Sequence, residues 1–354
     1  MKIRTVGRGI ALISVAAVVF AACSSSGGSS APSSAASAAA SGGAAKALKI
    51  GFLPKDIVNT YFAAAKLGVD NAAKADGSTV IQVGPNEAKA DLQVPFIADL
   101  TTQKVDAILI SADGKDEVAP NLKAAMAAGI KVVGFDSSPA VGAYNVFVNQ
   151  TDFSLIGGAM AQWACDLAPN CTGEIAILSA TATATNQNSW IADMNTALKD
   201  PKFATLKLVD TVYGDDNATT STTQANGLLT KHPNLKVIVA PTTVGILAAA
   251  QVVSAAKKQD SVKVTGLGLP NDMKTFVKDG TSPKFGLWNV PALGQLAYVV
   301  AAKLISGEIK GSEGETFTVK GLNGDKPYTI GKDSVVILGP PFEFNKDNVD
   351  TFNF

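Results

Sequence analysis

The stretch LKIGFLPKDIVNTYF, residues 48–62, decides the fold class. An apolar run ends abruptly at Pro54-Lys55 and a helical pattern follows, which is the layout of the first strand, turn and helix of a doubly wound α/β domain. Nucleotide-binding versions carry glycines in this turn, because the backbone must approach a phosphate closely. Here the turn carries a lysine, a carboxylate, an asparagine and two aromatic residues. It is therefore predicted to serve a ligand other than a nucleotide.

The same alternation of apolar strands and Ala-rich helical patterns continues to the end of the chain. The expected strands are LKIGFL, TVIQVG, VDAILIS, KVVGFD, YNVFVN, EIAILS, LVDTVY, VIVAPT, KVTGLG and FGLWNV. Near-continuous apolar strands separated by helices indicate parallel sheets covered on both faces. A body of roughly 310 residues exceeds one comfortable core, so two α/β lobes are expected.

The N-terminus indicates export. Lys2, Arg4 and Arg8 form a basic region, 9–20 are apolar, and two alanines precede Cys23. The apolar run is shorter than the ~20 residues of a spanning helix, although a retained signal anchor is the alternative. The pattern resembles a lipoprotein signal peptide, 1–22, that ends at a lipidated Cys23. Residues 23–46 are rich in Ser, Ala and Gly and are expected to form a flexible tether.

The two remaining cysteines, Cys165 and Cys171, flank the segment DLAPN. In an exported protein a disulfide that closes this small loop is plausible, and two free thiols are the alternative.

Composition argues against several classes of function. Lys plus Arg equals Asp plus Glu at 30 each, so there is no excess positive charge for binding nucleic acid. The single histidine, His232, argues against a His-rich zinc site and a Ser-His-Asp triad. Neither a G-x-S-x-G nor a P-loop pattern occurs. We expect no catalytic residues, no metal and no cofactor; an enzyme would need paired carboxylates, for which Asp136 and Asp56 are the evident candidates.

Polar residues follow the strands where a ligand crevice is expected. Strand ends in an open parallel sheet meet at one edge, and ligands bind there. Asp136 can accept from two hydroxyl groups, and Lys55 can only donate. Tyr61 and Trp288 offer aromatic faces to the C–H surfaces of a ring. The combination favours a polyhydroxylated neutral ligand.

These features together resemble a type I periplasmic binding protein of an ABC sugar importer, in the branch of rhamnose-binding and autoinducer-2-binding proteins. The motifs that carry the resemblance run through the whole body, and include LPK, GFDS, FVNQ, TATNQNSW, VIVAPTTVG, TGLGLPNDM, FGLWNV and FNKDNVDTFNF. The resemblance implies two doubly wound lobes joined by a three-strand hinge. It also implies that the ligand is bound by Lys55, Asp136, Asn186, Gln187, Pro241 and Thr243. Tyr61, Trp288 and Asn289 complete the expected ligand-binding set, the first two for their aromatic faces and Asn289 for its place after a strand.

Two of these positions depart from the autoinducer-2 binders. Their aspartate becomes Asn186 and their alanine becomes Thr243, so a deoxy sugar such as L-rhamnose is favoured over autoinducer-2. Asn186 and Thr243 could instead cap the helices that follow them. Trp163 and Trp190 fall within helical stretches and are interpreted as packing residues.

The resemblance further implies an N-terminal lobe of 47–148 plus 269–288 and a C-terminal lobe of 149–268 plus 289–354, with crossovers near Asn149, Gly268 and Asn289. The expected partners are a sugar ligand and a membrane ABC permease, for a monomer held by a lipid at the outer face of the cell membrane. A sensor that docks on a chemoreceptor or kinase is the alternative.

Overall fold

The computed structural model describes residues 47–354, and the predictions for the signal peptide, Cys23 and the tether lie outside these residues. The first strand, β1 (Lys49–Leu53), is buried and leads through the Pro54-Lys55 turn into helix α1 (Thr60–Asp76). Asn59 caps α1, because its side chain accepts a hydrogen bond from the backbone N–H of Tyr61 at 3.0 Å. The opening stretch therefore forms the expected strand, turn and helix.

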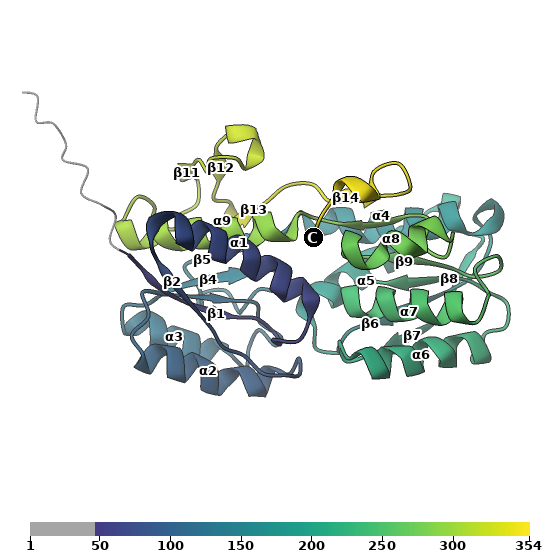
Figure 1. The fold of residues 1–354 in the computed structure, drawn as a ribbon, viewed down its shortest axis with the longest axis horizontal. Coiled ribbons are helices and arrows are strands. Elements are labelled where there is room, and N and C mark those ends of the chain that lie inside the picture. The colour runs from purple at the N-terminus through teal and green to yellow at the C-terminus, as the bar shows by residue number, and fades with distance from the viewer. Residues whose placement is uncertain (1–46) are drawn as a thin grey trace, which may run out of the picture. The chain divides into compact units, whose positions relative to one another are not determined.

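The first lobe is built on a six-stranded parallel sheet of order β13-β5-β4-β3-β1-β2. Its further strands are β2 (Thr79–Gln82), β3 (Ala107–Ile110), β4 (Lys131–Phe135), β5 (Val146–Asn149) and β13 (Val335–Ile337). Helices α2 (Ala90–Thr102) and α3 (Ala119–Ala127) cover one face, and α1 and α9 (Val290–Ser306) cover the other (Figure 1). The central strands β3 and β4 are almost entirely buried, as their apolar sequences predict.

The second lobe has a four-stranded parallel sheet of order β7-β6-β8-β9. Its strands are β6 (Gly173–Ser179), β7 (Leu206–Tyr213), β8 (Leu235–Ala240) and β9 (Lys263–Gly266). Its helices are α4 (Phe153–Leu167), α5 (Thr185–Ala197), α6 (Ala218–Lys231), α7 (Thr243–Ala255) and α8 (Pro270–Lys278). The pair α4 and α5 packs together, as does the pair α6 and α7 (Figure 1). The α/β fold with parallel sheets is as predicted.

The last third of the chain is divided between the lobes differently from the expectation. Helix α8 packs on α7, and β10 (Phe285–Leu287) joins the edge of the second sheet through a bridge between Leu267 and Gly286. Helix α9 packs on α1, and β13 pairs with β5. Residues 269–288 thus pack with the second lobe and α9 with the first, the reverse of the expected allocation.

The connections between the lobes follow from this arrangement. The chain passes between them after β5, again between β10 and α9, and finally between β13 and β14 (Phe342–Phe344). Gly268 is not a crossover, because its N–H donates to the carbonyl of Gly286 within the second lobe at 3.1 Å. The alternation of strands and helices in the sequence could not reveal this crossover, because the sequences of β9 and β10 do not show which lobe the following segment enters.

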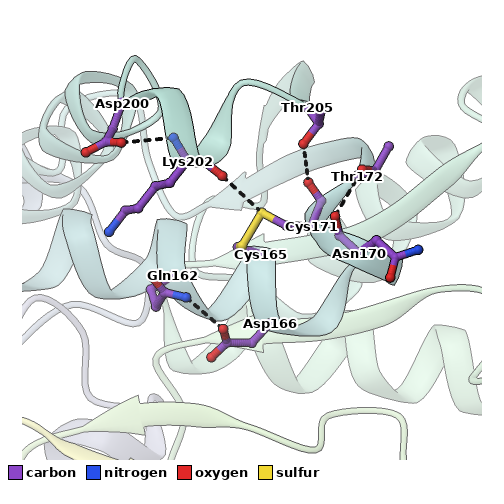
Figure 2. Close-up of a disulfide and its surroundings, with 9 residues drawn as sticks. All are labelled: Gln162, Cys165, Asp166, Asn170, Cys171, Thr172, Asp200, Lys202 and Thr205. Atoms are coloured by element: carbon purple, nitrogen blue, oxygen red, sulfur yellow. Dashed lines mark hydrogen bonds between the residues drawn. A yellow bond between two sulfur atoms is a disulfide. The ribbon is translucent and has the colours of Figure 1, made fainter.

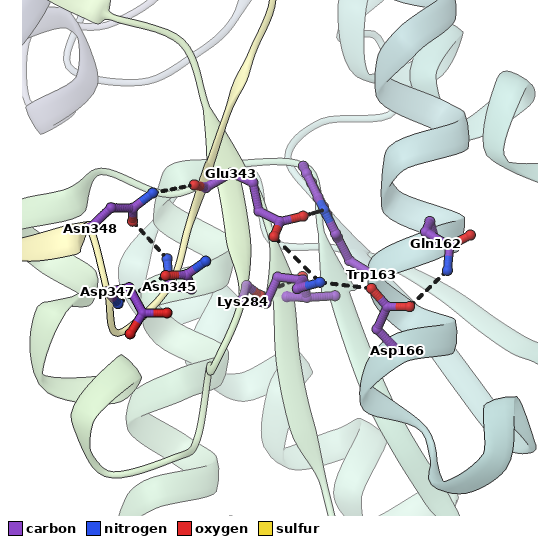
Figure 3. Close-up of polar contacts among 9 residues, drawn as sticks. Gln162, Trp163, Asp166, Lys284, Glu343, Asn345, Asp347 and Asn348 are labelled. Atoms are coloured by element: carbon purple, nitrogen blue, oxygen red, sulfur yellow. Dashed lines mark hydrogen bonds and ion pairs between the residues drawn. The ribbon is translucent and has the colours of Figure 1, made fainter.

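A polar cluster ties β14 to the second lobe (Figure 3). Strand β14 pairs with β10, and Glu343 on it accepts a hydrogen bond from Trp163 Nε1–H at 2.9 Å. Lys284 Nζ bridges Asp166 at 2.8 Å and Glu343 at 3.4 Å, and the Asp166 bond is the main reason why the pKa of Lys284 is raised. Trp163 is therefore a packing residue, as interpreted, that also anchors the returning chain.

Cys165 and Cys171 are joined by a disulfide at the end of α4 (Figure 2). The bond closes a loop with a sequence separation of 6, and the Thr205 hydroxyl donates to the carbonyl of Cys171 at 2.7 Å. Cys171 stands two residues before β6 and Thr205 one residue before β7, so the loop lies at the N-terminal ends of these strands, whereas the cavity residues follow the carboxyl ends. Its role is structural.

Short pairs complete the C-terminal third: β11 (Thr316–Phe317) pairs with β12 (Tyr328–Thr329). These were not expected from the sequence, because two-residue strands leave no period-two pattern to detect.

Candidate functional site

A cavity forms between the lobes where the strand ends meet. Its lining comprises Lys55, Asn59, Tyr61, Phe62, Asp136, Asn186, Gln187, Trp190, Asp216, Pro241, Thr242, Thr243, Leu267, Leu287 and Trp288. Residues of both lobes contribute to this lining. Apart from Lys55, Asp136 and Asp216, every lining side chain is neutral.

Asp136 lies at the centre of a fixed hydrogen-bond network. It follows β4 in a left-handed backbone conformation with φ of 61°, which an aspartate tolerates better than most residues. Tyr61 Oη–H donates to its Oδ1 at 2.9 Å and Ser111 Oγ–H donates to its Oδ2 at 2.7 Å. Trp288 Nε1–H in turn donates to Tyr61 Oη at 2.9 Å. The carboxylate is therefore held in one orientation before any ligand arrives.

Burial and the neighbouring carboxylate keep Tyr61 protonated. Desolvation is the main cause of the large rise in the pKa of Tyr61, and the charge on Asp136 adds to it. The phenol is thus a permanent hydrogen-bond donor to Asp136 across the physiological range. Each carboxylate oxygen has a further lone pair available for a ligand hydroxyl.

Lys55 bridges the two lobes through a single hydrogen bond. Its side chain is only 2% exposed, and Nζ donates to Asn186 Oδ1 of α5 at 3.2 Å. No ion pair within 4.0 Å holds it among the described residues, and an ammonium group has three donors. Two N–H groups of Lys55 therefore remain for oxygen atoms of a ligand.

The α5 side of the cavity presents amides. Gln187 Oε1 accepts from Ser179 Oγ at 3.1 Å and from the backbone N–H of Ala180 at 3.0 Å, which directs its NH2 group away from these partners. Asn186 Oδ1 also accepts from the Gln187 N–H at 3.0 Å. Ala184, not Asn186, is the N-cap of α5, so the capping alternative for Asn186 is wrong.

Thr243 begins α7 and contacts the opposite lobe. Thr242 is the N-cap of this helix, which excludes the capping role considered for Thr243. The Thr243 hydroxyl donates to Asn59 Oδ1 across the cleft at 3.4 Å. It joins the two walls, as the contact of Lys55 with Asn186 does.

Aromatic rings form the apolar part of the cavity. The rings of Tyr61 and Trp288 lie edge to face at 6.2 Å, and those of Trp190 and Trp288 lie 5.8 Å apart. Trp190 lines the cavity, although the sequence favoured a packing role, and its buried Nε1–H has no hydrogen-bond partner among the described residues. Phe62, Leu267 and Leu287 complete an apolar surface.

The structure brings together eight of the nine residues of the expected ligand set, and Asn289 is the exception. Asn289 caps α9 instead, by accepting from the Ala292 N–H at 3.0 Å. The sequence missed Asn59, Trp190 and Asp216. Asp216 follows β7, at a strand end like the residues that were found, but it stands three residues beyond the strand.

An adjoining groove, here called the acidic groove, opens from the same cleft. Its charged lining residues are Asp56, Glu87, Lys89, Asp91, Asp113, Glu117, Asp215 and Asp216. It shares Asn59, Asp216 and Thr243 with the cavity. Asp56 lies here rather than beside Asp136 in the cavity, so the two carboxylates proposed for catalysis do not line one site.

Burial raises the pKa values of three carboxylates in the acidic groove. Desolvation is the largest cause for Asp56, Asp113 and Asp216. For Asp216 the pKa rises from 3.8 to about 6; the Thr242 bond and Lys55 oppose the rise, whereas the charges on Asp56 and Asp113 add to it. Carboxylates of both lobes therefore face each other across the cleft.

Within residues 47–354, no cluster of three or more His, Cys, Asp or Glu side chains has a metal-binding arrangement. Over the same residues, no helix is both long and apolar enough to span a bilayer.

Two α/β lobes with a cavity between them, lined by fixed polar groups and aromatic rings, are typical of a class of ligand-binding proteins. The chain belongs to a family within that class: residues 50–309 match the periplasmic binding protein domain family. This is a family of exported solute-binding proteins, and the finding agrees with the resemblance drawn from the sequence motifs.

Solved structures support the same assignment. An ABC transporter solute-binding protein from Clostridium phytofermentas with bound L-rhamnose is 36% identical, with a TM-score of 0.83, and the match covers 87% of this chain and 98% of that one. A sugar ABC transporter protein from Actinomyces odontolyticus is 41% identical, with a TM-score of 0.70 and the same coverage. A D-ribose/D-allose-binding protein from Pseudomonas aeruginosa is 27% identical over 66% of this chain and 74% of its own length.

Proposed function

We propose that this chain is the substrate-binding component of a sugar ABC importer and that it captures a monosaccharide, L-rhamnose or a related deoxy sugar, in the cavity between its lobes. The observation that supports this proposal most strongly is that the cavity combines a fixed acceptor, Asp136, with buried donors that lack partners. These donors are Trp190 Nε1–H and the free N–H groups of Lys55. A neutral molecule covered in hydroxyl groups satisfies both kinds at once.

The apolar lining favours a sugar that lacks one hydroxyl group. Phe62, Leu267 and Leu287 offer no hydrogen bond, so a methyl group fits against them better than a hydroxymethyl group does. The Thr243 side chain combines a hydroxyl and a methyl group in the same wall. The L-rhamnose bound to the protein from Clostridium phytofermentas, a 6-deoxy sugar, agrees with this preference.

Capture is proposed to proceed by closure of the lobes. Lys55 with Asn186 and Thr243 with Asn59 are cross-cleft contacts that form only when the walls meet. A ligand that bridges the walls would stabilise the closed form by its differential affinity for it. The closed form would then dock on a membrane permease, with the protein acting as a monomer tethered by a lipid on Cys23.

Autoinducer-2 is the second candidate ligand. Lys55, Asp136, Gln187 and Pro241 match four of the six positions that the resemblance to autoinducer-2 binders identifies, and all four line the cavity. Asn186 and Thr243 distinguish this cavity from that pattern.

Calorimetric titration of the purified protein with L-rhamnose, D-ribose, D-glucose and the autoinducer-2 precursor tests the proposal. We expect L-rhamnose to bind at least ~10-fold more tightly than the other sugars, a ratio that corresponds to about 1.4 kcal/mol. Asp136→Asn keeps the shape but removes the charge, and should weaken binding strongly. Asp260→Asn, an exposed change on the second lobe, is the matched control.

Three results would contradict the proposal. Tight binding of the autoinducer-2 precursor alone would assign the second candidate. If none of the four ligands gives a binding signal, the proposal that the protein binds a sugar is wrong. If the purified protein converts L-rhamnose to a product, the protein is an enzyme rather than a binding protein.

A further inference from the structure

The acidic groove contains buried carboxylate oxygens with no hydrogen-bond partner among the described residues. Asp56 Oδ1 accepts from the backbone N–H groups of Val58 and Asn59 at 3.0 and 2.8 Å, whereas its Oδ2 has no partner. Asp113 Oδ1 is likewise without a partner. The two side chains are only 1% and 2% exposed. A buried acceptor without a donor costs free energy, so these oxygens indicate a missing donor.

Hydrogen bonds within the first lobe fix the Asp113 backbone and the Asp56 side chain. Gln93 Oε1 accepts from the Asp113 N–H at 2.9 Å, and Gln93 Nε2 donates to the carbonyls of Pro54 and Ser111, each at 2.9 Å. Asp56 is fixed by the turn that its Oδ1 closes before α1. These partners all belong to the first lobe, so the positions of the Asp56 side chain and the Asp113 backbone do not depend on the second lobe.

The charged side chains of the groove are acidic apart from one lysine. Asp216 approaches from the second lobe, where Thr242 Oγ1–H donates to it. The groove's single lysine, Lys89, is paired with Glu87 at the exposed edge, so it does not neutralise the buried carboxylates. Lys55 acts on these carboxylates only at longer range, because it forms no ion pair within 4.0 Å among the described residues. A donor that also carries positive charge is the complementary group.

The groove differs from the sugar cavity in that its lining contains no aromatic residue. It therefore lacks the flat apolar faces on which a second sugar ring would stack. An ammonium group is compact, carries three donors and needs no such face.

We propose that the acidic groove is a subsite for a protonated amine, carried either by a ligand seated in the cavity or by a separate small amine. The groove and the cavity share Asn59, Asp216 and Thr243, so an amino substituent on a bound sugar reaches the carboxylates without leaving the cleft. The inference depends on the proposed function only because it assumes that ligands bind in the cleft. The same carboxylates disfavour ligands that carry a phosphate or a carboxylate.

Calorimetric titration with 1,4-diaminobutane at low ionic strength and near-neutral pH tests the subsite, without sugar and with saturating L-rhamnose. The neutral analogue 1,4-butanediol is the control ligand. L-rhamnosamine (2-amino-2,6-dideoxy-L-mannose) is compared with L-rhamnose in a second series. A separate amine as ligand predicts that the diamine binds and the diol does not. An amino sugar as ligand predicts that L-rhamnosamine binds at least ~10-fold more tightly than L-rhamnose.

Asp113→Asn and Asp56→Asn are near-isosteric and should each weaken amine binding ~10-fold or more, with unchanged binding of L-rhamnose. Asp260→Asn removes the same charge from the exposed surface and should change neither. Circular dichroism melts show whether each variant is folded.

No binding of the diamine together with no preference for L-rhamnosamine would overturn the subsite. An equal loss in Asp260→Asn would also overturn it, because the attraction would then be a diffuse effect of net charge. Neither result touches the binding of L-rhamnose. Conversely, if the protein binds the amine but no sugar, the amine subsite is supported and the proposed sugar-binding function is wrong.

Discussion

The two walls of the cleft are built on different principles. The first-lobe wall places a charged group, Asp136, in a network that Tyr61 and Ser111 complete within the same lobe. The second-lobe wall offers neutral amide and hydroxyl groups, of which Asn186 and Thr243 bond directly to the first lobe. On the proposed function, this difference predicts a division of roles, in which the first wall binds the ligand and the second wall closes over it.

The largest effect is expected from removing the charged group of the first wall. Asp136→Ala removes the acceptor and leaves Tyr61 and Ser111 without their common partner. Charge-assisted bonds contribute ~1.5–3 kcal/mol each, so we expect a loss of at least ~100-fold in sugar affinity by calorimetry.

Gln187→Ala on the second wall is the matched comparison for Asp136→Ala. It removes a neutral amide whose carbonyl is already used by Ser179 and Ala180, and should cost only ~10-fold. Equal losses in the two variants would contradict a division of roles between the walls.

The next effect concerns the pH dependence of stability, through a carboxylate on the second wall. The pKa of Asp216 is raised from 3.8 to about 6, so the folded protein holds this proton more tightly than the unfolded chain between those values. The free energy of unfolding therefore falls as the pH rises through this window. Above pH ~7 the cost is fully present, at about 2 kcal/mol after allowance for partial exposure.

Chemical denaturation at pH ~5 and pH ~8 measures this cost. Asp216→Asn should raise the free energy of unfolding at the higher pH and flatten the dependence, while Asp56 and Asp113 leave a residual slope of the same sign. An unchanged slope in Asp216→Asn would show that this carboxyl ionises normally in the folded protein.

A smaller effect tests whether the network on the first wall preorganises Asp136. Tyr61→Phe leaves Trp288 Nε1–H and Asp136 Oδ1 without their shared hydroxyl partner. We expect sugar affinity to fall ~10-fold and stability to fall by ~1–2 kcal/mol. Tyr144→Phe, which removes a hydroxyl hydrogen bond to the Asp333 carbonyl outside the cavity, is the control, and an equal loss of affinity there would indicate a general effect of stability rather than orientation of the carboxylate.

The smallest effect is expected from adding a charge to the second wall. Asn186→Asp places a carboxylate next to Lys55 Nζ, now 3.2 Å from Asn186 Oδ1, and creates a cross-cleft ion pair in the empty protein. The pair competes with the ligand for Lys55, so L-rhamnose should bind ~3–5-fold more weakly, a change of less than ~1 kcal/mol by calorimetry. Asn195→Asp, at an exposed position of the same helix, controls for added charge.

Much of the architecture could be predicted from the sequence, because strand and helix patterns are local. All ten apolar runs form strands, and Asp136, Gln187 and Thr243 line the cleft because the carboxyl ends of parallel strands meet at one edge. The same logic missed Asp216, which stands beyond its strand. It predicted that Trp190 packs in the core, which is confirmed, but not that Trp190 also lines the cavity.

The sequence by itself determined the fold class, the strand order along the chain and the polar groups near the strand ends, because side-chain periodicity and turn chemistry act over a few residues. Only the tertiary structure decided which lobe receives α8 and α9, that Trp190 faces the cavity, and that Asp56, Asp113 and Asp216 converge on one groove. These features depend on contacts between separate elements, such as α1 with α9, which lie far apart along the described chain, and no local sequence pattern shows which of several similar faces will meet.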